Sequence, residues 1–256
     1  MRTTPVVLFI GGHDPTGGAG IQADIESAGQ LGARAVSLVT ALTAQDTQNV
    51  AAKWPTPVDA LLRQFDTLVA DIRPDVVKIG MLGEPTQATA LAGRLTRLGC
   101  PLVLDPVLAA GGGFDLGGDG LIDSIRTHLL PLTTLLTPNR NEARRLAGDT
   151  DADRAAGSLL AAGAGAVLLT GADEADGQQV LNRLYRSSTA PLECAWPRLP
   201  YHYHGSGCTL ASACATLLAH GLALEQAVTR AQETTWTTLD RAEAVGHGQW
   251  LPRRRP

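Results

Sequence analysis

The chain has 256 residues, of which 44% are hydrophobic and 18% are charged, and its formal net charge is −4. These values are typical of a globular protein with a sizeable core, and they exclude the overall basic field that attracts nucleic acid. No stretch reaches the roughly 18 uninterrupted apolar residues of a membrane span, and the first apolar run is too short for a secretory signal. We therefore expect one α/β domain over residues 1–256, with a tail at 249–256 and no membrane or nucleic-acid partner.

The cysteines predict a reducing compartment. Cys100, Cys194, Cys208 and Cys214 have no C-x-x-C spacing, which argues against a disulfide framework and against a zinc site. We therefore expect a cytoplasmic protein. The basic run at residues 253–255 is expected to be a solvated tail rather than a binding patch.

Short apolar runs alternate with helix-length segments along the chain. The runs lack the alternation of half-exposed strands, as expected for strands that are buried on both faces. The expected strands are Val6–Ile10, Ala35–Thr40, Val76–Ile79, Leu102–Leu104, Thr134–Thr137 and Ala166–Thr170. The expected helices are Ile21–Leu31, Pro57–Ala70, Pro85–Leu98, Asn141–Ala147 and Arg154–Ala162. Repeated β–α units predict a parallel sheet with helices on both faces, and these units are too few for an eight-fold barrel, so we expect an open sheet.

Small or polar residues follow nearly every expected strand. In an open parallel sheet, ligands bind beyond the carboxyl ends of the strands, so we expect these residues to meet at one edge. They are residues 11–20, 43–47, 78–82, 105–107, 137–139 and 170–171. Residues 18–23 formally fit the dinucleotide pattern G-x-G-x-x-A, but they lie too far beyond the first strand, and no P-loop lysine follows a glycine-rich loop. A tight structural turn remains an alternative for residues 17–20.

A second glycine-rich stretch, Gly111–Gly120, follows the fourth expected strand. Its conformational freedom is high, which predicts a mobile flap beside the site. A connector without a functional role is the alternative.

The stretch over residues 204–221 combines a glycine-rich loop with an alanine-rich, helix-length segment. Unpaired amide groups and the positive end of the dipole make such a helix start a site for anions. We expect the amides of Gly205, Ser206 and Gly207 to hold a phosphoryl group. The same dipole is expected to lower the pKa of the Cys208 thiol.

Three roles are open for Cys208. As a nucleophile it would need a positioned base and an acid to orient that base, and no such acid is evident. As a structural thiol it would resemble Cys214 on the same predicted helix. As a general base it would remove the proton of a substrate hydroxyl while the glycine amides hold the phosphoryl group. The surrounding glycines favour the third role.

Two carboxylates are candidates for a magnesium site. Asp105 directly follows an expected strand and is held by Pro106, and Glu142 lies at the start of an expected helix after Asn139. Carboxylate oxygens suit Mg²⁺, either directly or through water. For each residue, a helix cap or a surface carboxylate is the alternative.

Six segments together resemble the hydroxymethylpyrimidine and phosphomethylpyrimidine kinases of thiamine biosynthesis, which are members of the ribokinase-like superfamily. The resemblance covers nearly the whole chain. In chain order the segments are Gly-Gly-Ala-Gly-Ile-Gln-Ala-Asp (17–24), Thr-Ala-Gln-Asp-Thr (43–47), Lys-Ile-Gly-Met-Leu (78–82), Leu-Asp-Pro-Val (104–107), Leu-Thr-Pro-Asn…Glu (136–142) and His-Gly-Ser-Gly-Cys-Thr-Leu (204–210).

The resemblance implies a ribokinase-like three-layer α/β/α sandwich with an open, mostly parallel central sheet. It implies phosphoryl transfer from ATP, with Mg²⁺, to the hydroxymethyl group of 4-amino-5-hydroxymethyl-2-methylpyrimidine, and a second transfer to the monophosphate. Relatives are commonly homodimers.

The resemblance also implies roles by position. Gln45 would pair with the amine and a ring nitrogen of the pyrimidine, which suits a side-chain amide. Asp24 would support a ring pocket lined by Gly12, Ala19, Met81 and Val107. The path of ATP and Mg²⁺ would run along Asn139, Glu142, Thr170 and Gly171. Cys208 would be the base, beside an anion hole formed by Gly205 and Gly207.

The chain departs from the family pattern in three places. Gly12-His13-Asp14 stands where the family usually reads Gly-Ser-Asp, and Thr170-Gly171-Ala172-Asp173 stands where it usually has Lys-Gly-Gly-His. The missing lysine removes an expected partner for phosphate, and the atypical segment Asp173–Pro200 predicts altered handling of the nucleotide or the substrate. Two other functions therefore stay open: a pyridoxal kinase with the same cysteine-bearing anion hole, and a weakened pyrimidine-binding or regulatory protein.

Overall fold

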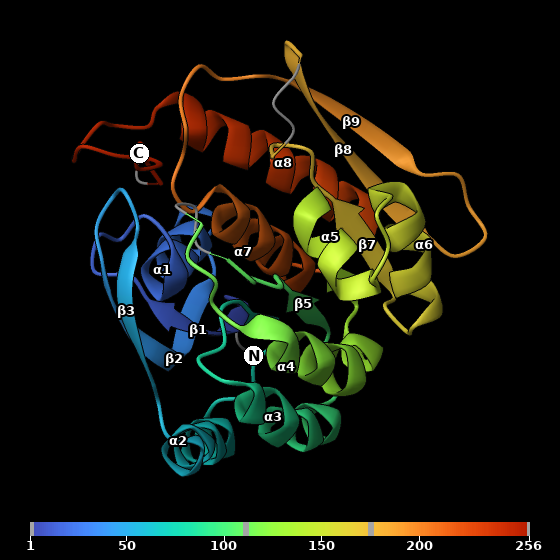
Figure 1. Cartoon of the computed structure of the whole chain (residues 1–256). Coiled ribbons are helices and arrows are strands. Elements are labelled where there is room, and N and C mark those ends of the chain that lie inside the picture. Colours follow the sequence, from blue (N-terminus) through green and yellow to red (C-terminus); the bar gives the residue numbers. More distant parts are fainter. Residues whose placement is uncertain (1–2, 110–112, 174–176, 255–256) are drawn as a thin grey trace.

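Nine strands form one sheet in the computed structural model, which describes residues 3–109, 113–173 and 177–254 (Figure 1). Their order across the sheet is β3-β2-β1-β4-β5-β6-β7-β8-β9. The strands are β1 (Val6–His13), β2 (Arg34–Gln45), β3 (Val50–Pro55), β4 (Val76–Ile79), β5 (Leu102–Leu104), β6 (Leu135–Leu136), β7 (Ala166–Leu169), β8 (Gln179–Arg186) and β9 (Leu192–Pro197). The neighbours from β2 to β7 are parallel, whereas β3 at one edge and the β8–β9 hairpin at the other are antiparallel. The prediction of an open, mostly parallel sheet is confirmed.

β1 lies between β2 and β4 because it is apolar on both faces. Side chains of a strand point alternately to the two faces of the sheet. Val7 and Phe9 accordingly pack into one hydrophobic cluster, whereas Leu8 and Ile10 pack into the other. Such a strand can be stable only where helices cover both faces.

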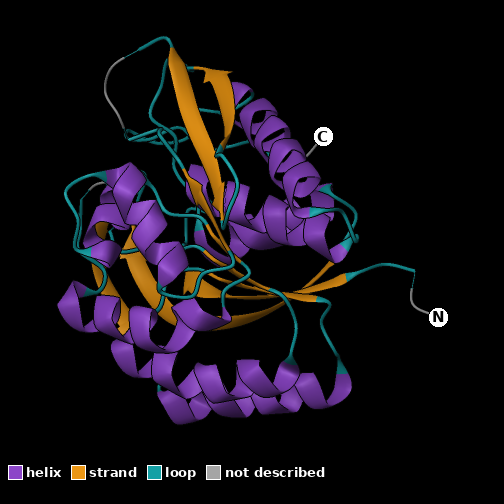
Figure 2. Ribbon diagram, turned by 90° about the vertical axis from the view of Figure 1, so that its right-hand side faces the viewer, coloured by secondary structure: helices purple, strands orange, loops and turns teal. Residues whose placement is uncertain are grey.

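Helices do cover both faces, as Figure 2 shows. The cluster of Val7 and Phe9 is completed by α1 (Gly20–Gln30), α7 (Ser206–Ala219) and α8 (Leu224–Asp240). The cluster of Leu8 and Ile10 is completed by α2 (Val58–Asp71), α3 (Pro85–Leu98), α4 (Gly118–Ser124), α5 (Arg140–Ala147) and α6 (Ala152–Ala161). Two short helical turns, η1 (Ile125–Leu129) and η2 (Leu130–Leu132), follow α4. The predicted three-layer arrangement is confirmed.

Capping side chains set where α5 and α6 begin. Asn139 caps α5 in a capping box with Glu142, in which each side chain accepts the other residue's amide. Asp151 accepts two amides at the start of α6, which therefore begins at Ala152 rather than at Arg154 as predicted. Over the described ranges, no helix is both long enough and apolar enough to cross a membrane.

The strands that the sequence analysis did not predict lie at the edges of the sheet. β3 pairs only with β2, and β8 and β9 form a hairpin inside the atypical segment Asp173–Pro200. The residues of β9 alternate between half-buried and exposed positions. Edge strands of this kind lack the continuous apolar run by which the central strands were identified.

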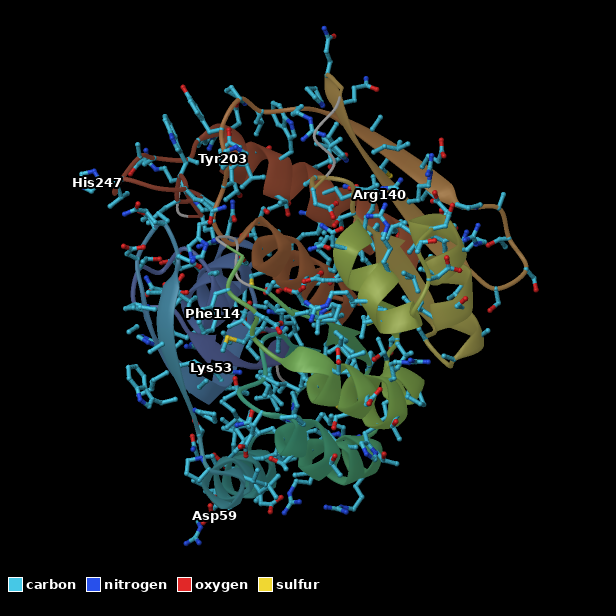
Figure 3. All side chains as sticks on the ribbon, viewed as in Figure 1. Lys53, Asp59, Phe114, Arg140, Tyr203 and His247 are labelled. Atoms are coloured by element: carbon cyan, nitrogen blue, oxygen red, sulfur yellow. The ribbon has the colours of Figure 1, made fainter. Side chains whose placement is uncertain are left out.

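Much of the predicted flap at Gly111–Gly120 has a defined structure. Residues 110–112 lie outside the described residues. Beyond them, Leu116 is buried, its amide donates to the Leu108 carbonyl at 2.9 Å, and α4 begins at Gly118. Lys53 of β3 donates to the carbonyl oxygens of Leu116 and Gly83, so β3 also holds this segment (Figure 3). The prediction of a mobile flap is therefore wrong for residues 116–120.

The C-terminal segment returns to the body of the protein near α1 (Figure 1). Trp250 donates its amide to the His202 carbonyl and accepts the amide of His204. Arg254 is only 2% exposed. The prediction of a solvated basic tail is wrong at Arg254, because main-chain carbonyl groups surround its guanidinium.

Candidate active site

The start of α7 lies beside the loop that follows β1. Gly205 caps α7 with φ +69°, and a Cβ there would collide with the carbonyl oxygen of Gly18. Gly20, with φ +60°, approaches the carbonyl of Gly12 as closely. Two positions therefore require glycine, because the backbones touch and because both have positive φ. The first-turn amides of α7, at Ser206 and Gly207, have no acceptor within the helix and are free for an anion.

Asp14 joins the loop after β1 to the residue that precedes Gly205. It accepts a hydrogen bond from the Ala19 amide at 2.8 Å, and its other oxygen accepts from the Thr16 amide at 2.8 Å. The ring nitrogen Nε2 of His204 lies 2.8 Å from Asp14. Burial raises the pKa of Asp14, but the hydrogen bond and charge of His204 and the two amides outweigh it and lower the pKa to about 2. Sequence reasoning missed both residues as partners.

Cys208 lies in the first turn of α7 and faces a group of buried charges. Burial is the largest effect and raises the pKa of its thiol. The charge of Lys78 opposes this rise, whereas the charges of Asp105 and Asp24 add to it. A hydrogen bond from the Gly20 amide lowers the pKa slightly, and the result is about 12. The prediction that the helix start lowers this pKa is therefore wrong, because the loss of water around the thiol outweighs the helix dipole. In the unliganded protein the thiol is protonated at neutral pH.

Lys78 is the buried cation of this group, and sequence reasoning gave it no role. Its Nζ lies 2.8 Å from Asp24, and the Ser212 hydroxyl donates to the same carboxylate oxygen at 2.5 Å. Burial lowers the pKa of Lys78, but the charges of Asp24, Cys208 and Asp105 more than compensate, and the pKa is raised. Lys78 thus stays charged although it is 1% exposed. The sequence did contain a signal for this role: Lys78 lies inside an apolar strand, shortly before the small residues that follow that strand.

Asp105 and Glu142 form the candidate metal site. Burial raises the pKa of Asp105 to about 6, although the charge of Lys78 lowers it; the charge of Asp24 adds to the rise, and a hydrogen bond with Cys208 opposes it. Burial and the charge of Asp105 raise the pKa of Glu142 to about 8, against the lowering effect of the Asn139 and Leu108 amides. One oxygen of Asp105, Oδ2, is buried without a hydrogen-bond partner. Two buried carboxylates with raised pKa values, one of which has an unpartnered oxygen, fit a divalent cation.

The candidate pyrimidine residues lie at the ends of β1, β2 and β4. Gly12 packs against Met81, since a Cβ on Gly12 would lie 2.8 Å from the Met81 sulfur. Ala19 caps α1 next to them. Gln45 lies at the end of β2, opposite Val50 of β3. Val107, after β5, is half-buried. The structure brings Gly12 and Met81 into contact and places Gln45 at the end of β2, the strand next to β1.

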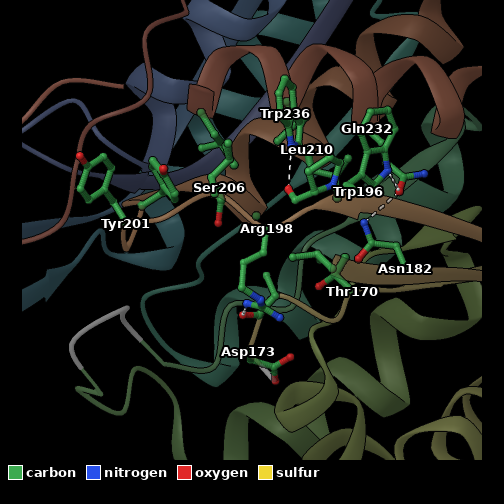
Figure 4. Close-up of a pocket in the computed structure, with 18 of the residues that line it drawn as sticks. Thr170, Asp173, Asn182, Trp196, Arg198, Tyr201, Ser206, Leu210, Gln232 and Trp236 are labelled. Atoms are coloured by element: carbon green, nitrogen blue, oxygen red, sulfur yellow. Dashed lines mark hydrogen bonds between the residues drawn. The ribbon is translucent and has the colours of Figure 1, made fainter. Parts of the chain in front are cut away.

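A pocket of about 600 Å³ opens beside the start of α7 (Figure 4). Its wall combines apolar and aromatic side chains with a few polar groups, which is typical of a site for a planar ligand. Its lining includes Thr170, Asn182, Trp196, Arg198, Ser206, Gly207, Leu210, Gln232 and Trp236. Sequence reasoning interpreted the two tryptophans as core or rim packing, and the structure places both in this wall.

Hydrogen bonds hold the polar side of the pocket in place. Asn182 accepts the Gly171 amide at 3.0 Å and donates to Gln232 at 2.9 Å, and Trp196 donates to the same Gln232 oxygen at 3.1 Å. Thr170 pairs with Asn139, the cap of α5. The four residues predicted along the nucleotide path thus lie together: Thr170 and Gly171 are consecutive, Thr170 pairs with Asn139, and Asn139 is hydrogen-bonded with Glu142.

The open α/β sheet, the glycine-lined helix start with a pocket beside it, and the buried carboxylate pair define a small-molecule kinase of the ribokinase-like class. The family model for phosphomethylpyrimidine kinase matches residues 14–252. The chain belongs to this family.

Individual relatives agree with the family assignment. The chain is 38% identical to the hydroxymethylpyrimidine/phosphomethylpyrimidine kinase of Streptomyces coelicolor, over 96% of this chain and 93% of the relative. It is 37% identical to the enzyme of the same description from Escherichia coli, over 94% of both chains.

Solved structures show the same fold. The pyridoxal kinase of Staphylococcus aureus in complex with pyridoxal superposes with a TM-score of 0.91 at 26% identity, over 99% of this chain and 94% of that chain. The phosphomethylpyrimidine kinase of Clostridium difficile gives a TM-score of 0.77 at 29% identity, over 90% and 97%. Fold similarity therefore spans two vitamin kinase activities.

Proposed function

We propose that the protein transfers the terminal phosphoryl group of ATP to 4-amino-5-hydroxymethyl-2-methylpyrimidine, and then to the resulting monophosphate, to give the pyrophosphate used in thiamine biosynthesis. One observation carries this proposal. The start of α7 borders the pocket through Ser206 and Gly207, and its next residue, Cys208, faces Lys78 and Asp105. A nucleotide in the pocket and an acceptor at the strand ends would therefore meet at this helix start. Relatives described as hydroxymethylpyrimidine/phosphomethylpyrimidine kinases, to which the chain is similar over 93% and 94% of their length, support this proposal.

In this proposal the pocket holds the nucleotide. Trp196, Trp236 and Leu210 offer apolar surface to the base, and Asn182 and Gln232 offer hydrogen bonds. S. aureus pyridoxal kinase has been solved with ADP and with AMP-PCP, at TM-scores of 0.91 and 0.90. The phosphates would then pass Thr170 and reach the amides of residues 205–208, which hold the transferring group as its charge develops.

The carboxylate pair would hold Mg²⁺. A Mg²⁺ ion on Asp105 and Glu142 would supply positive charge beside the phosphates and would cancel the Asp105 charge that raises the pKa of Cys208. Lys78 keeps its charge next to the thiol and stabilises the thiolate. In a loose phosphoryl-transfer transition state the hydroxyl proton leaves late, and Cys208 is placed to accept it.

The acceptor site would lie at the ends of β1, β2 and β4. Gly12, Ala19, Met81 and Val107 would line the ring pocket, and Gln45 would pair with the aminopyrimidine edge. Asp24 would act indirectly, by holding Lys78 in place. A single assay tests the proposal: purified protein, ATP and Mg²⁺ are mixed with the pyrimidine, and both products are followed over time. Formation of neither product would contradict it.

Pyridoxal is the second candidate acceptor. The structure superposes more closely on a pyridoxal kinase than on the phosphomethylpyrimidine kinase, at TM-scores of 0.91 and 0.77. Turnover of pyridoxal with a higher kcat/KM than the pyrimidine, in parallel assays, would favour this candidate. Because Thr170 is neutral where the family has a cation, tight pyrimidine binding without turnover, measured by calorimetry, would instead indicate a binding or regulatory protein.

We also propose that the protein is a cytoplasmic homodimer. Cys100, Cys194, Cys208 and Cys214 are all free thiols, which suits a reducing compartment. Leu42 and Trp54 lie opposite each other in the β2–β3 pair and are 55% and 57% exposed. An apolar pair on an edge hairpin is suited to contact with a second copy.

A further inference from the structure

Arg254 is a buried arginine outside the predicted site. Its guanidinium donates to the carbonyl oxygens of Gly17, at 3.1 Å, and Gly18. Its Nε donates to the Thr209 hydroxyl at 3.0 Å, and its Nη1 lies 3.5 Å from Glu26. Burial lowers the pKa of Arg254, and nearby negative charges partly restore it. A fully enclosed guanidinium is costly unless its donors are satisfied, and this one is surrounded by acceptors.

The groups that Arg254 binds belong to the two backbones that form the anion site. Gly17 and Gly18 open the turn that ends at Gly20, whose amide hydrogen-bonds with the Cys208 thiol. Thr209 follows Cys208 in α7. Arg254 therefore bridges both sides of the contact between Gly20 and Cys208.

The turn at residues 17–20 is held by hydrogen bonds of its main chain: the Gly17 amide donates to the Asp14 carbonyl at 3.1 Å and the Gly18 amide to the Thr16 hydroxyl at 3.1 Å. A Cβ on Gly18 would collide with His204 and would lie 2.8 Å from Leu251, and Gly17 has φ +73°. The turn therefore packs without side chains and depends on hydrogen bonds of its main chain. The Asp14 carboxylate accepts a hydrogen bond from the Ala19 amide. The Arg254 guanidinium donates to the carbonyl oxygens of Gly17 and Gly18. The planar fork of a guanidinium can bind two carbonyls at once, which an ammonium group cannot reproduce.

We propose that Arg254 is a positioning residue for phosphoryl transfer, which fixes the turn at residues 17–20 against the first turn of α7 so that Gly20 and Cys208 face the transferring group. The inference rests on the proposed kinase function. It predicts that loss of Arg254 acts mainly on turnover, since Arg254 does not line the pocket proposed for the nucleotide.

The test compares Arg254→Ala and Arg254→Lys with Arg253→Ala. Arg253 is the matched control, because its side chain is more than half exposed and makes only a 3.3 Å ion pair with Glu243. For Arg254→Ala we expect kcat to fall by about 10- to 100-fold, as when one charge-assisted contact is lost, with KM for ATP changed by less than about threefold. Arg254→Lys should be nearly as impaired. Guanidinium ion at millimolar concentration should restore part of kcat in Arg254→Ala and have no effect on Arg253→Ala.

Hydrogen exchange of the same variants provides a readout that does not require activity. Peptides that cover residues 15–22 should exchange faster in Arg254→Ala than in Arg253→Ala, and guanidinium should slow them again, while peptides from β4 and β5 stay protected. Inactive wild type with these exchange changes would contradict the kinase proposal, and with it the role in phosphoryl transfer, and would leave only the finding that Arg254 holds the turn. Unchanged kcat, an effect on KM alone, or a folded Arg254→Ala variant that guanidinium does not rescue would overturn the role. If Arg254→Ala does not fold, Thr209→Val removes the Nε acceptor together with the hydrogen bond from the Thr209 hydroxyl to the Gly205 carbonyl. It should lower kcat relative to Thr209→Ser, which keeps the hydroxyl, and equal kcat in these two variants would overturn the role.

Discussion

The thiol of Cys208 shows how strongly burial acts on a single residue of this site. A helix start by itself favours the thiolate, yet the pKa of the half-buried Cys208 is raised to about 12, because desolvation of its thiol and the charges of two aspartates outweigh that effect. Lys78 is the opposing charge; the Asp24 carboxylate, which accepts a hydrogen bond from the Ser212 hydroxyl, holds it in place. The reactivity of the cysteine is therefore a property of this buried group rather than of the helix.

Replacement of the thiol tests its role as base. We expect Cys208→Ser to lower kcat by about 100-fold or more, as for loss of a general base, with the KM values largely kept. Cys214→Ala is the control, since Cys214 is a buried thiol further along α7 with no charged partner. Steady-state kinetics of both variants measure the effect. Near-normal turnover of Cys208→Ser would reduce Cys208 to a packing residue.

Arg198 is the other residue whose charge should matter. Among the described residues that line the pocket, it is the only arginine or lysine. Its Nε is held at 3.0 Å by the Gly177 carbonyl. Since Thr170 is neutral, we expect Arg198 to bind the phosphates, so that Arg198→Ala raises KM for ATP about tenfold. Arg230→Ala, an exposed arginine of α8 outside the pocket, should leave KM unchanged; equal KM values in the two variants would contradict this role.

At the scale of elements, the site is a junction of loops rather than one motif. The exit of β1, the turn at residues 17–20, the start of α7 and the C-terminal segment contact one another through main-chain groups. Asp14 and Arg254 lie on opposite sides of this junction. Glycines are required there because the backbones approach too closely for a Cβ.

The hydrogen bonds of Asp14 predict a pH dependence of stability. The pKa of Asp14 falls from 3.8 to about 2 on folding, so the ionised form stabilises the folded state by about 2 kcal/mol. This contribution is fully present above pH 4 and is lost as the pH falls toward 2. The difference in free energy of unfolding between wild type and Asp14→Asn, from urea titrations, should shrink over that range. Asp59→Asn is the control, because Asp59 is exposed on α2 (Figure 3); a difference that stays constant from pH 5 to pH 2 would contradict the assignment.

At the scale of the whole molecule, the parallel strands bring distant segments to one edge. The loops after β1, β4, β5 and β7 supply residues from distant parts of the chain. The start of α7, which packs on the same face of the sheet as α1, completes the group. The antiparallel edges serve different purposes. The β8–β9 hairpin builds the pocket wall, whereas the β2–β3 pair carries the exposed Leu42 and Trp54.

The oligomeric state can be tested on that pair. We expect sedimentation at micromolar concentration to show a dimer for wild type and a monomer for the double variant Leu42→Ser, Trp54→Ser, because the substitutions remove the apolar surface that a partner would cover. Val245→Ser changes an equally exposed apolar residue elsewhere and should remain dimeric. A monomeric wild type would contradict the homodimer.

The sequence by itself determined the central parallel strands, most of the helices and the segments that carry the site, because apolar periodicity, caps and glycine spacing act locally. It could not determine the edge strands β3, β8 and β9, whose pairing depends on neighbours far away in the chain. Nor could it show that the pKa of Cys208 is raised, that Lys78 is a buried cation, or that Arg254 lies under the glycine turn. These properties arise from desolvation and from charges brought together across the sheet, and only the tertiary structure decides them.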